Sequence, residues 1–222
     1  MTERSIQIAI DGPAGAGKST VAKQLSERLG ILYLDTGAMY RAFAFFCLRE
    51  GLGTAPTDRQ ILDAFERFDL VFEGKRILLN GEEITSAIRT PEIDKAVSPI
   101  SANALIREKM VEKQKAIASG NDIVMEGRDI CDVVLPDARY KFYLDASVDE
   151  RARRRWLQNT GKGIDSSLED IRSDIIRRDD YDSSREAAPL TVSRDATVVD
   201  TTGMSLEEVI DLIITAVREE RA

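Results

Sequence analysis

The stretch Gly12-Pro13-Ala14-Gly15-Ala16-Gly17-Lys18-Ser19 decides the fold of this chain. The apolar run just before it, residues 6–10, is typical of a buried strand. The residues after it, 18–29, carry apolar side chains at three- and four-residue spacing, which predicts an amphipathic helix. A glycine-rich turn between a strand and a helix can point its backbone N–H groups at phosphate oxygens. The sequence therefore predicts a phosphate-binding loop.

The spacing G-x-x-x-x-G-K-[ST] assigns a role to two side chains of this loop. It directs Lys18 to the β- and γ-phosphates of a nucleoside triphosphate and the Ser19 hydroxyl to a magnesium ion. The alternative is a glycine-rich turn that carries a lysine by chance. We expect nucleotide contacts from Gly12, Pro13, Ala14, Gly15, Ala16, Gly17, Lys18, Ser19 and Thr20.

Composition limits the type of protein. The 222 residues, 43% hydrophobic and 32% charged, suit one large α/β domain or a core domain with a small insertion. There is no apolar stretch of membrane-spanning length and no secretory signal at the start, so we expect a cytoplasmic protein with no membrane partner. Cys47 and Cys131 lack the short spacing of a zinc site and are expected to be reduced thiols.

Charge and residue usage narrow the chemistry. The net charge of −8 argues against binding to a nucleic-acid polymer. The absence of histidine excludes histidine bases and Ser-His triads, which leaves Lys, Arg, Asp and a hard metal ion. Of 22 arginines, 11 lie between Arg128 and Arg194. Such a cluster favours a site for a compact polyanion, and surface ion pairs are the alternative.

The order of predicted elements indicates the architecture. Strands alternating with helices predict a doubly wound, mostly parallel five-stranded α/β sheet. The expected buried strands are 6–10, 31–34, 123–125, 141–144 and 197–200, and the expected helices are 18–29, 38–50, 58–68, 102–119, 167–180 and 206–218.

Two insertions are expected within this single domain, 1–222. Short strand-like runs around Asn80-Gly81 predict hairpins and a small separate lobe over about 66–90. Two arginine-bearing helices bracket a glycine-containing segment, 159–163, and predict a lid over 151–185. Pro91 and Pro99 are expected to interrupt regular structure between the lobe and the helix 102–119.

Polar residues follow the strands at the edge where α/β sheets bind ligands. The first group is Thr36, Tyr40 and Arg41, and the second is Glu126-Gly127-Arg128-Asp129. Helix spacing places Arg151, Arg154 and Arg155 on one face. It places Arg178, Asp182 and Arg185 on another if the helix 167–180 continues. The alternatives are a helix cap with surface residues for the first group and a turn with an internal ion pair for the second.

Two classes of enzyme use a phosphate loop. A hydrolysing switch protein would need a metal-binding carboxylate at a strand end, for which Glu126 and Asp145 are the candidates, and a guanine-specific one would carry Asn-Lys-x-Asp, which is absent. A small-molecule kinase needs an acceptor pocket and several arginines that neutralise both polyanions. The chain supplies the second set, so the sequence favours a kinase.

The motifs together resemble the bacterial cytidylate kinases, which are P-loop nucleoside monophosphate kinases. The resemblance is carried, in order, by Ile10–Ser19, Asp35–Arg41, Ile88–Thr90, Glu126–Asp129, and Arg178–Asp180 with Asp182 and Arg185. It implies phosphoryl transfer from ATP, with Mg²⁺, to CMP or dCMP, and a lobe that binds the nucleoside monophosphate. A kinase of the same architecture that acts on UMP or AMP is the alternative, and a non-catalytic nucleotide sensor is a third possibility. We expect a monomer.

The resemblance also implies a role for each residue. Arg41, Arg128 and Arg185 would hold the monophosphate, Ser98, Arg107 and Asp129 would read cytosine, and Arg178 and Asp182 would meet the sugar. From the residues themselves we expect in-line transfer in which Lys18, a Ser19-bound Mg²⁺ and the lid arginines Arg151, Arg154 and Arg155 neutralise the transferring phosphoryl group. Asp35, Asp129 or Asp182 could assist. The chain departs from the family pattern at Cys131-Asp132, where Gly-Thr is usual. This departure leaves the local backbone path and the substrate preference open.

Overall fold

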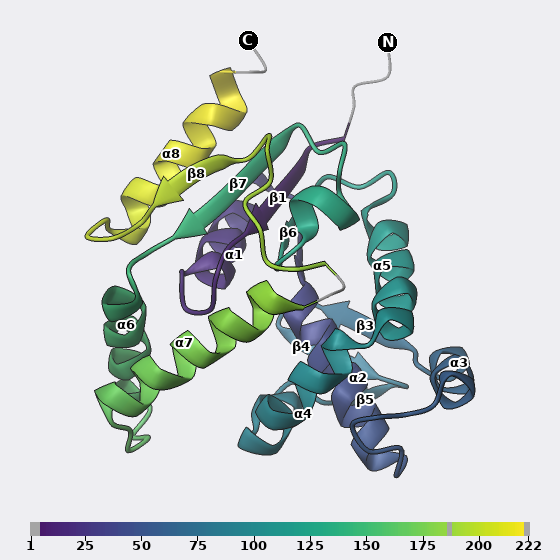
Figure 1. The fold of residues 1–222 in the computed structure, drawn as a ribbon. Helices are drawn as coiled ribbons and strands as arrows, with labels where there is room; N and C mark the ends of the chain where they lie inside the picture. Colours follow the sequence, from purple (N-terminus) through teal and green to yellow (C-terminus); the bar gives the residue numbers. More distant parts are fainter. Residues whose placement is uncertain (1–4, 186–187, 220–222) are drawn as a thin grey trace. The chain divides into compact units, whose positions relative to one another are not determined.

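The computed structural model describes residues 5–185 and 188–219 of the chain (Figure 1). The chain forms two compact units. The first unit combines residues 1–34 with 118–222, and the second unit comprises residues 35–117. Within the described residues, no helix has both the length and the apolar character needed to cross a membrane.

The first unit is built on a five-stranded sheet. Its strand order is β2-β6-β1-β7-β8, and β1 pairs in parallel with both β6 and β7, as β7 does with β8. The prediction of a mostly parallel five-stranded α/β sheet is confirmed. The strands are β1 (Gln7–Asp11), β2 (Leu32–Asp35), β6 (Ile123–Glu126), β7 (Tyr140–Asp145) and β8 (Thr197–Asp200).

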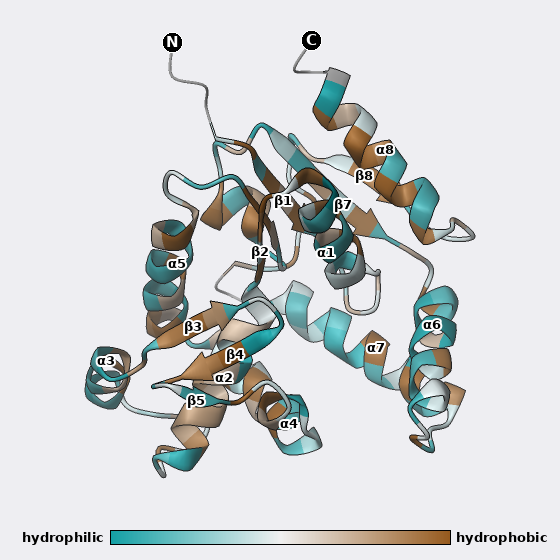
Figure 2. Cartoon of the chain, turned by 180° about the vertical axis from the view of Figure 1, so that it is seen from behind, coloured by the Kyte–Doolittle hydropathy of each residue, from teal (hydrophilic) through white to brown (hydrophobic). Residues whose placement is uncertain are grey.

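Two helices share the apolar core of this sheet. Helix α1 (Lys18–Leu29) contributes Val21 and Leu25, and helix α8 (Leu206–Glu219) contributes Ile210, which is fully buried. Figure 2 shows β1 in the colour of hydrophobic residues and α8 with alternating hydrophilic and hydrophobic bands. The one-sided pattern of these helices is what a helix on a sheet requires.

Strand β2 differs from its prediction. The run 31–34 was expected to be buried on both faces, yet the Leu32 side chain is 52% exposed. β2 lies at the edge of the sheet, where one side lacks a neighbouring strand. Its short apolar run is therefore only half-buried, and the prediction was wrong on this point.

Helices α6 (Val148–Gly161) and α7 (Leu168–Ser184) occupy the predicted lid. They pack together through a small cluster formed by Val148, Ala152, Ile171 and Ile175. Figure 2 shows them as mostly hydrophilic. Helix α7 continues four residues beyond its predicted end at 180, so Arg178 and Asp182 lie on one continuous helix.

The second unit holds the predicted hairpins. Strands β3 (Leu70–Glu73), β4 (Arg76–Leu79) and β5 (Glu82–Glu83) form an antiparallel sheet. Asn80 and Gly81 join β4 to β5 with φ angles of 51° and 81°, the left-handed values of a tight hairpin turn. The hairpin prediction is confirmed. The lobe limits 66–90 and the lid limits 151–185 stay predictions, and the compact unit around the hairpins is larger, at 35–117.

Four helices complete the second unit: α2 (Thr36–Arg49), α3 (Asp58–Glu66), α4 (Pro91–Ala102) and α5 (Ala104–Ala118), with a short helical turn η1 (Ala87–Arg89) before α4. Their core includes a group of phenylalanine rings, in which Phe43 stacks on Phe65 and meets Phe68 edge-on.

Helix α4 was not predicted. Pro91 was expected to interrupt regular structure but stands at the first helical position, behind the capping residue Thr90, where a missing N–H costs nothing. Pro99 lies inside the helix and removes one N–H from its ladder. The predicted single helix 102–119 begins instead at Ala104, after a break at Asn103.

The segment after Asp129 forms a short π-helix, η2 (Ile130–Val134), that was also not predicted. The Leu135 N–H donates to the Ile130 carbonyl at 2.8 Å, which is the i to i+5 bond of this helix type. The departure from the family pattern at Cys131-Asp132 falls inside η2.

Candidate active site

The phosphate loop closes around its lysine. Lys18 Nζ donates to the carbonyl oxygens of Gly12 at 2.7 Å and Pro13 at 2.8 Å, and its side chain is buried. Burial, together with the positive charges of Arg128 and Arg178, lowers the pKa of Lys18 to about 7. The acids Glu126 and Asp11 oppose this shift. Such a buried ammonium group is stabilised by an added anion, which is what a polyphosphate supplies.

Two glycines fix the path of the loop. Gly12 has a φ of +146°, and a Cβ atom at this position would lie 2.0 Å from the carbonyl oxygen of Leu144. Gly17 has a φ of +92° and caps α1 in the left-handed conformation. Only glycine adopts both conformations without strain. The backbone path predicted from the glycine spacing is thus built into the loop.

Oxygen atoms gather beside Ser19, the predicted magnesium ligand. The Ser19 hydroxyl donates to Glu126 Oε1 at 2.5 Å, and the Tyr33 hydroxyl donates to the same oxygen at 3.2 Å. Among the described residues there is no group of three or more Cys, Asp or Glu side chains arranged to hold a metal ion. The hydroxyl and the carboxylate are hard oxygen ligands that fit Mg²⁺, which takes its other ligands from water and substrate phosphates.

Arg151 of α6 is committed to the phosphate loop. It is buried, it donates to the carbonyl oxygens of Ala146 at 2.8 Å and Ala14 at 3.0 Å, and it forms an ion pair with Asp179 of α7. The Asp179 carboxylate also accepts the Ala14 N–H at 3.2 Å. Arg151 and Asp179 therefore hold both sides of the Ala14 residue.

The three lid arginines do not share one environment. Arg154 donates to the Thr201 carbonyl at 2.6 Å and to Glu150 at 2.8 Å, and its Nη1 would lie 3.8 Å from a Cβ atom at Gly17. Arg155 is exposed. Helical spacing predicted one shared face for all three arginines, but of the three only Arg151 and Arg154 border the phosphate loop.

Several residues predicted to bind the molecule that accepts the phosphoryl group lie together in the first unit. Arg128 Nε lies 2.8 Å from Asp182 Oδ2, and Arg185 Nη1 lies 3.8 Å from Asp182 Oδ1. Burial opposes ionisation of Asp182, but the charges of Arg128, Arg185 and Arg178 outweigh it and lower its pKa. Asp129 accepts the Val133 N–H through its carbonyl at the start of η2. The three arginines around Asp182 can therefore bind an anion while Asp182 remains ionised.

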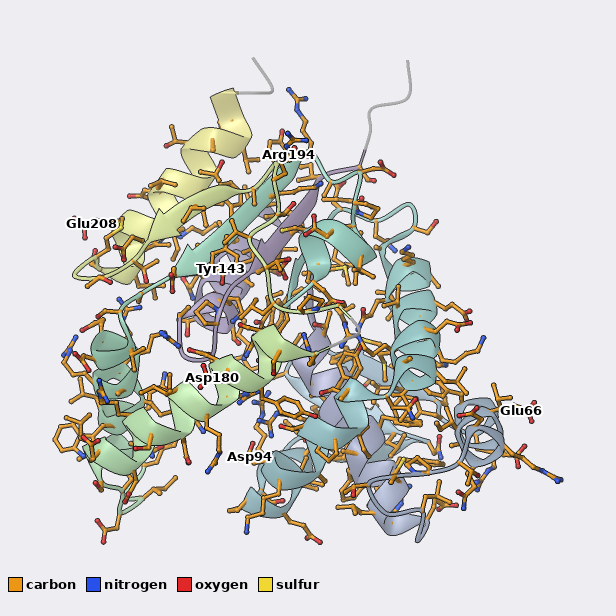
Figure 3. The ribbon with its side chains drawn as sticks, in the orientation of Figure 1. Glu66, Asp94, Tyr143, Asp180, Arg194 and Glu208 are labelled. Atoms are coloured by element: carbon orange, nitrogen blue, oxygen red, sulfur yellow. The ribbon has the colours of Figure 1, made fainter. Side chains whose placement is uncertain are left out.

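The remaining acceptor residues lie in the second unit. Arg41 Nη2 pairs with Asp94 Oδ1 at 2.5 Å, and Asp94 on α4 is labelled in Figure 3. The Arg107 guanidinium lies 5.6 Å from the centre of the Tyr40 ring, a cation–π contact. Arg107 also donates to the Ser101 carbonyl at 3.1 Å. Two further predicted residues, Thr36 and Ser98, are respectively buried at the start of α2 and half-buried on α4.

A family model described as Cytidylate kinase matches residues 8–219 of the chain. The chain belongs to the cytidylate kinase family. Among its relatives, a cytidylate kinase of Caldanaerobacter subterraneus is 45% identical over 99% of this chain and 97% of that protein. Those of Shouchella clausii and Geobacillus kaustophilus are each 47% identical, with coverage of 97% of both chains for the former and 98% of both chains for the latter.

The family match confirms the sequence-based predictions of a cytidylate kinase and of a nucleoside monophosphate kinase activity. Two solved structures share the fold. A protein of Eubacterium ventriosum gives a TM-score of 0.52 at 13% identity, covering 96% of this chain and 99% of its own. A protein of Thermus thermophilus gives 0.51 at 18% identity, covering 99% and 100%. At these identities the likeness is one of fold alone.

The departure from the cytidylate kinase pattern is mild in structural terms. Cys131 is fully buried, and its thiol points at the carbonyl oxygens of Ala9 and Phe142, at 3.7 and 3.9 Å. Burial raises its pKa, so it stays a neutral thiol, as expected of a small buried side chain. Asp132 is exposed to solvent. The replacement therefore adds no charge to the protein interior.

Two carboxylates of the cytidylate kinase site had no assigned role in the predicted kinase mechanism. Glu126 was predicted to lie at the ligand-binding edge, but a metal-binding role was assigned to it only for the hydrolysing switch class. Asp179 stood inside a recognised motif, but nothing in the sequence linked it to Ala14, 165 residues away. Hydrogen bonds at such separation have no local signal in a single sequence.

The ion pairs of Glu150 predict a pH-dependent stability. Hydrogen bonds from Arg153 and Arg154 lower the pKa of Glu150 to about 2, against the effect of burial. A carboxylate whose pKa falls on folding stabilises the folded state above its unfolded pKa of about 4.3, and this is lost as pH falls toward 2. We expect Glu150→Gln to cost about 1 kcal/mol at pH 7, since such a pair is screened by solvent.

The measurement is thermal unfolding of both proteins between pH 7 and pH 2.5. The difference in melting temperature is expected to shrink steadily below pH 4.5. The matched control is Glu27→Gln on α1, an exposed carboxylate whose hydrogen bond comes from the neutral amide of Gln24, and it should show no such trend. A difference between Glu150→Gln and the parent that is constant over this range would contradict the ion-pair explanation.

Proposed function

We propose that the protein transfers the γ-phosphoryl group of ATP, with Mg²⁺, to CMP or dCMP, which gives ADP with CDP or dCDP. We further propose that it acts as a cytoplasmic monomer. The observation that carries the reaction is the buried Lys18 ammonium, which lies in a glycine-rich loop among the charges of Arg128 and Arg178. This concentration of positive charge suits two polyanions that must react with each other.

The donor side of the proposal uses the phosphate loop. Backbone N–H groups of residues 12–20 would hold the ATP phosphates at the start of α1, and Lys18 would turn from the Gly12 and Pro13 carbonyls to the β- and γ-phosphates. The magnesium ion, held by Ser19 and Glu126, would supply charge neutralisation at the phosphates. Arg154 would add charge as the phosphoryl group moves. Arg151 and Arg155 would also neutralise charge on the transferring phosphoryl group.

The acceptor side uses the two groups of arginines. Arg128 and Arg185 would leave part of their pairing with Asp182 to grip the monophosphate, with Arg41 as the third partner. Ser98, Arg107 and Asp129 would read the cytosine ring, since a carboxylate accepts from its amino group and the other two donate to its acceptors. Arg178 and Asp182 would meet the sugar. Thr36 and Tyr40 would line the same substrate.

No covalent enzyme intermediate is required. The acceptor phosphate is an anion at neutral pH and can attack the γ-phosphorus directly, so it needs little help from a base. The work of the protein is positioning and charge neutralisation. Asp129 would therefore act mainly through recognition of the acceptor.

A change of Asp129 to alanine tests the reading of cytosine. We expect the ratio of kcat/KM for CMP to that for UMP to fall about tenfold to a hundredfold, because one charge-assisted hydrogen bond to the base is lost. The KM for ATP should change by less than about twofold, since donor binding uses other residues. Asp132→Ala, which removes an exposed carboxylate three residues away, is the matched control and should leave the ratio unchanged. An unaltered ratio in Asp129→Ala would mean that the base is read by other residues.

A further inference from the structure

Asp11, the last residue of β1, carries a buried carboxylate to which the catalytic roles above assign nothing. Its side chain is 2% exposed. Asp11 Oδ1 accepts the Ile130 N–H at 2.9 Å, and Oδ2 accepts the Cys131 N–H at 2.8 Å. These are the first two N–H groups of η2, which have no partner within the helix itself. Both carboxylate oxygens of Asp11 thus accept hydrogen bonds from one short segment of backbone.

The same segment has a second attachment to β1. The Gly127 N–H donates to the Ile10 carbonyl at 2.9 Å. Arg128 and Asp129 therefore form a short arch whose two ends are fixed to consecutive residues of one strand. The residue that follows Asp11 in the chain is Gly12, where the phosphate loop begins.

This arrangement carries a cost that a neutral side chain would avoid. A buried carboxylate is poorly solvated, and burial raises the pKa of Asp11, with the charge of Asp129 adding to the effect. A carboxylate, however, is the one short side chain with two acceptor oxygens that can take two N–H groups at once. An asparagine offers one oxygen and sets an NH₂ group against the second N–H.

We propose that Asp11 is a positioning residue for the acceptor: its carboxylate fixes the direction of the Arg128-Asp129 arch relative to the phosphate loop. The inference rests on the proposed roles of Arg128 and Asp129 in binding the nucleoside monophosphate. Strand β1 thereby sets the geometry of both the donor site and the acceptor site. Its backbone leads into the phosphate loop, and the Asp11 side chain at its end holds the Arg128-Asp129 arch.

The test is Asp11→Asn in the full chain, with KM values for ATP and CMP measured separately. We expect the KM for CMP to rise about tenfold or more, because one buried N–H loses its acceptor. The preference for CMP over UMP should fall in the same direction as in Asp129→Ala. The KM for ATP should stay within about twofold, since the phosphate loop keeps its own backbone contacts.

A matched control separates positioning from general stability. Asp122 also uses a carboxylate to accept a β1-side backbone N–H, that of Ile6 at 2.6 Å, but at the other end of the strand. Asp122→Asn should lower the melting temperature without changing either KM. If Asp11→Asn changes only the melting temperature, as this control does, Asp11 is a structural residue and the proposal is wrong.

The outcomes distinguish the inference from the function on which it rests. If Asp129→Ala lowers the CMP preference and Asp11→Asn leaves it and the CMP KM intact, the positioning proposal alone fails. If neither variant alters the preference while CMP is still the substrate, the reading of cytosine by Asp129 fails and takes the positioning proposal with it. Should Asp11→Asn not fold, Asp11→Ser, whose hydroxyl accepts one N–H, is expected to show the same rise in KM for CMP.

Amide hydrogen exchange provides a readout that is independent of activity. In the unmodified protein the Ile130 and Cys131 amides should exchange slowly, because both are bonded to a buried carboxylate. In the Asp11 variants their exchange should be at least about tenfold faster, whereas the Ile8 amide in the strand should keep its protection. Fast exchange of these two amides in the unmodified protein would contradict the proposal.

Discussion

Lys18→Ala is expected to lower kcat by about 10³-fold or more, the largest effect of any single change considered for this chain. The reason is that Lys18 is the buried cation of the phosphate loop and would meet the transferring phosphoryl group directly. The fold should survive, because the ammonium is poorly solvated where it lies and burial lowers its pKa to about 7. The measurement combines ADP-release kinetics with thermal unfolding of the same samples.

The control for this variant lies on the same helix. Lys23 is exposed on α1, where its ammonium lies 5.7 Å from the centre of the Tyr33 ring. Lys23→Ala should keep kcat within about twofold, as expected for an exposed cation away from the reacting groups. If kcat of Lys18→Ala lay within tenfold of the parent value, in a sample that unfolds normally, the proposed catalytic role of the phosphate loop would be wrong.

Arg128→Lys should lower kcat/KM for CMP by about 10² to 10³-fold while leaving ATP affinity nearly unchanged. The guanidinium of Arg128 can pair with Asp182 at 2.8 Å and still present a second edge to a phosphate. A lysine keeps the positive charge, so the buried Asp182 carboxylate still has a cationic partner. A lysine cannot, however, supply two parallel hydrogen bonds. Steady-state kinetics with CMP as the varied substrate measures the loss, and calorimetric titration with ATP measures donor binding.

Arg139→Lys is the matched substitution outside the site, since Arg139 is exposed and stacks on the Tyr140 ring. It should behave as the parent protein does. If Arg128→Lys retained full kcat/KM for CMP, Arg128 would be a structural partner of Asp182 and not a ligand of the acceptor.

Local signals explain why much of the fold could be predicted from the sequence. The phosphate loop needs glycine at positions such as Gly12, where a Cβ atom would collide with Leu144, so its spacing alone indicates its path. The Asn80-Gly81 turn likewise follows from residues that tolerate positive φ. Strand and helix types followed from apolar periodicity, which is a property of short windows.

What the sequence did not predict depends on contacts between distant segments. The half-exposed state of β2 depends on its place at the edge of the sheet. The sequence of a single strand does not show which position that strand takes in the sheet. Helix α4 tolerates Pro99 because packing of the helix outweighs one missing N–H. The first two N–H groups of the π-helix η2 donate to Asp11, which is 119 residues away from Ile130.

The candidate site shows the same division. Helical spacing predicted one shared face for Asp182 and Arg185, and the end of a buried strand predicted Arg128 at the ligand edge; these three side chains do meet. Helical spacing did not predict that Arg151 and Asp179 would both bind the Ala14 backbone, or that Arg155 would be exposed. Helical periodicity places side chains on a face, but the depth of each along that face is set by neighbouring elements.

The most direct test of the central claim is release of ADP from ATP and Mg²⁺ by the unmodified protein, with CMP, dCMP, UMP, AMP and GMP supplied one at a time. We predict ADP formation that depends on an acceptor and is strongly selective for CMP and dCMP. Equal or greater turnover with UMP or AMP would contradict the proposed reading of cytosine. ADP formation at the same rate with no acceptor present would contradict phosphoryl transfer to a nucleoside monophosphate altogether.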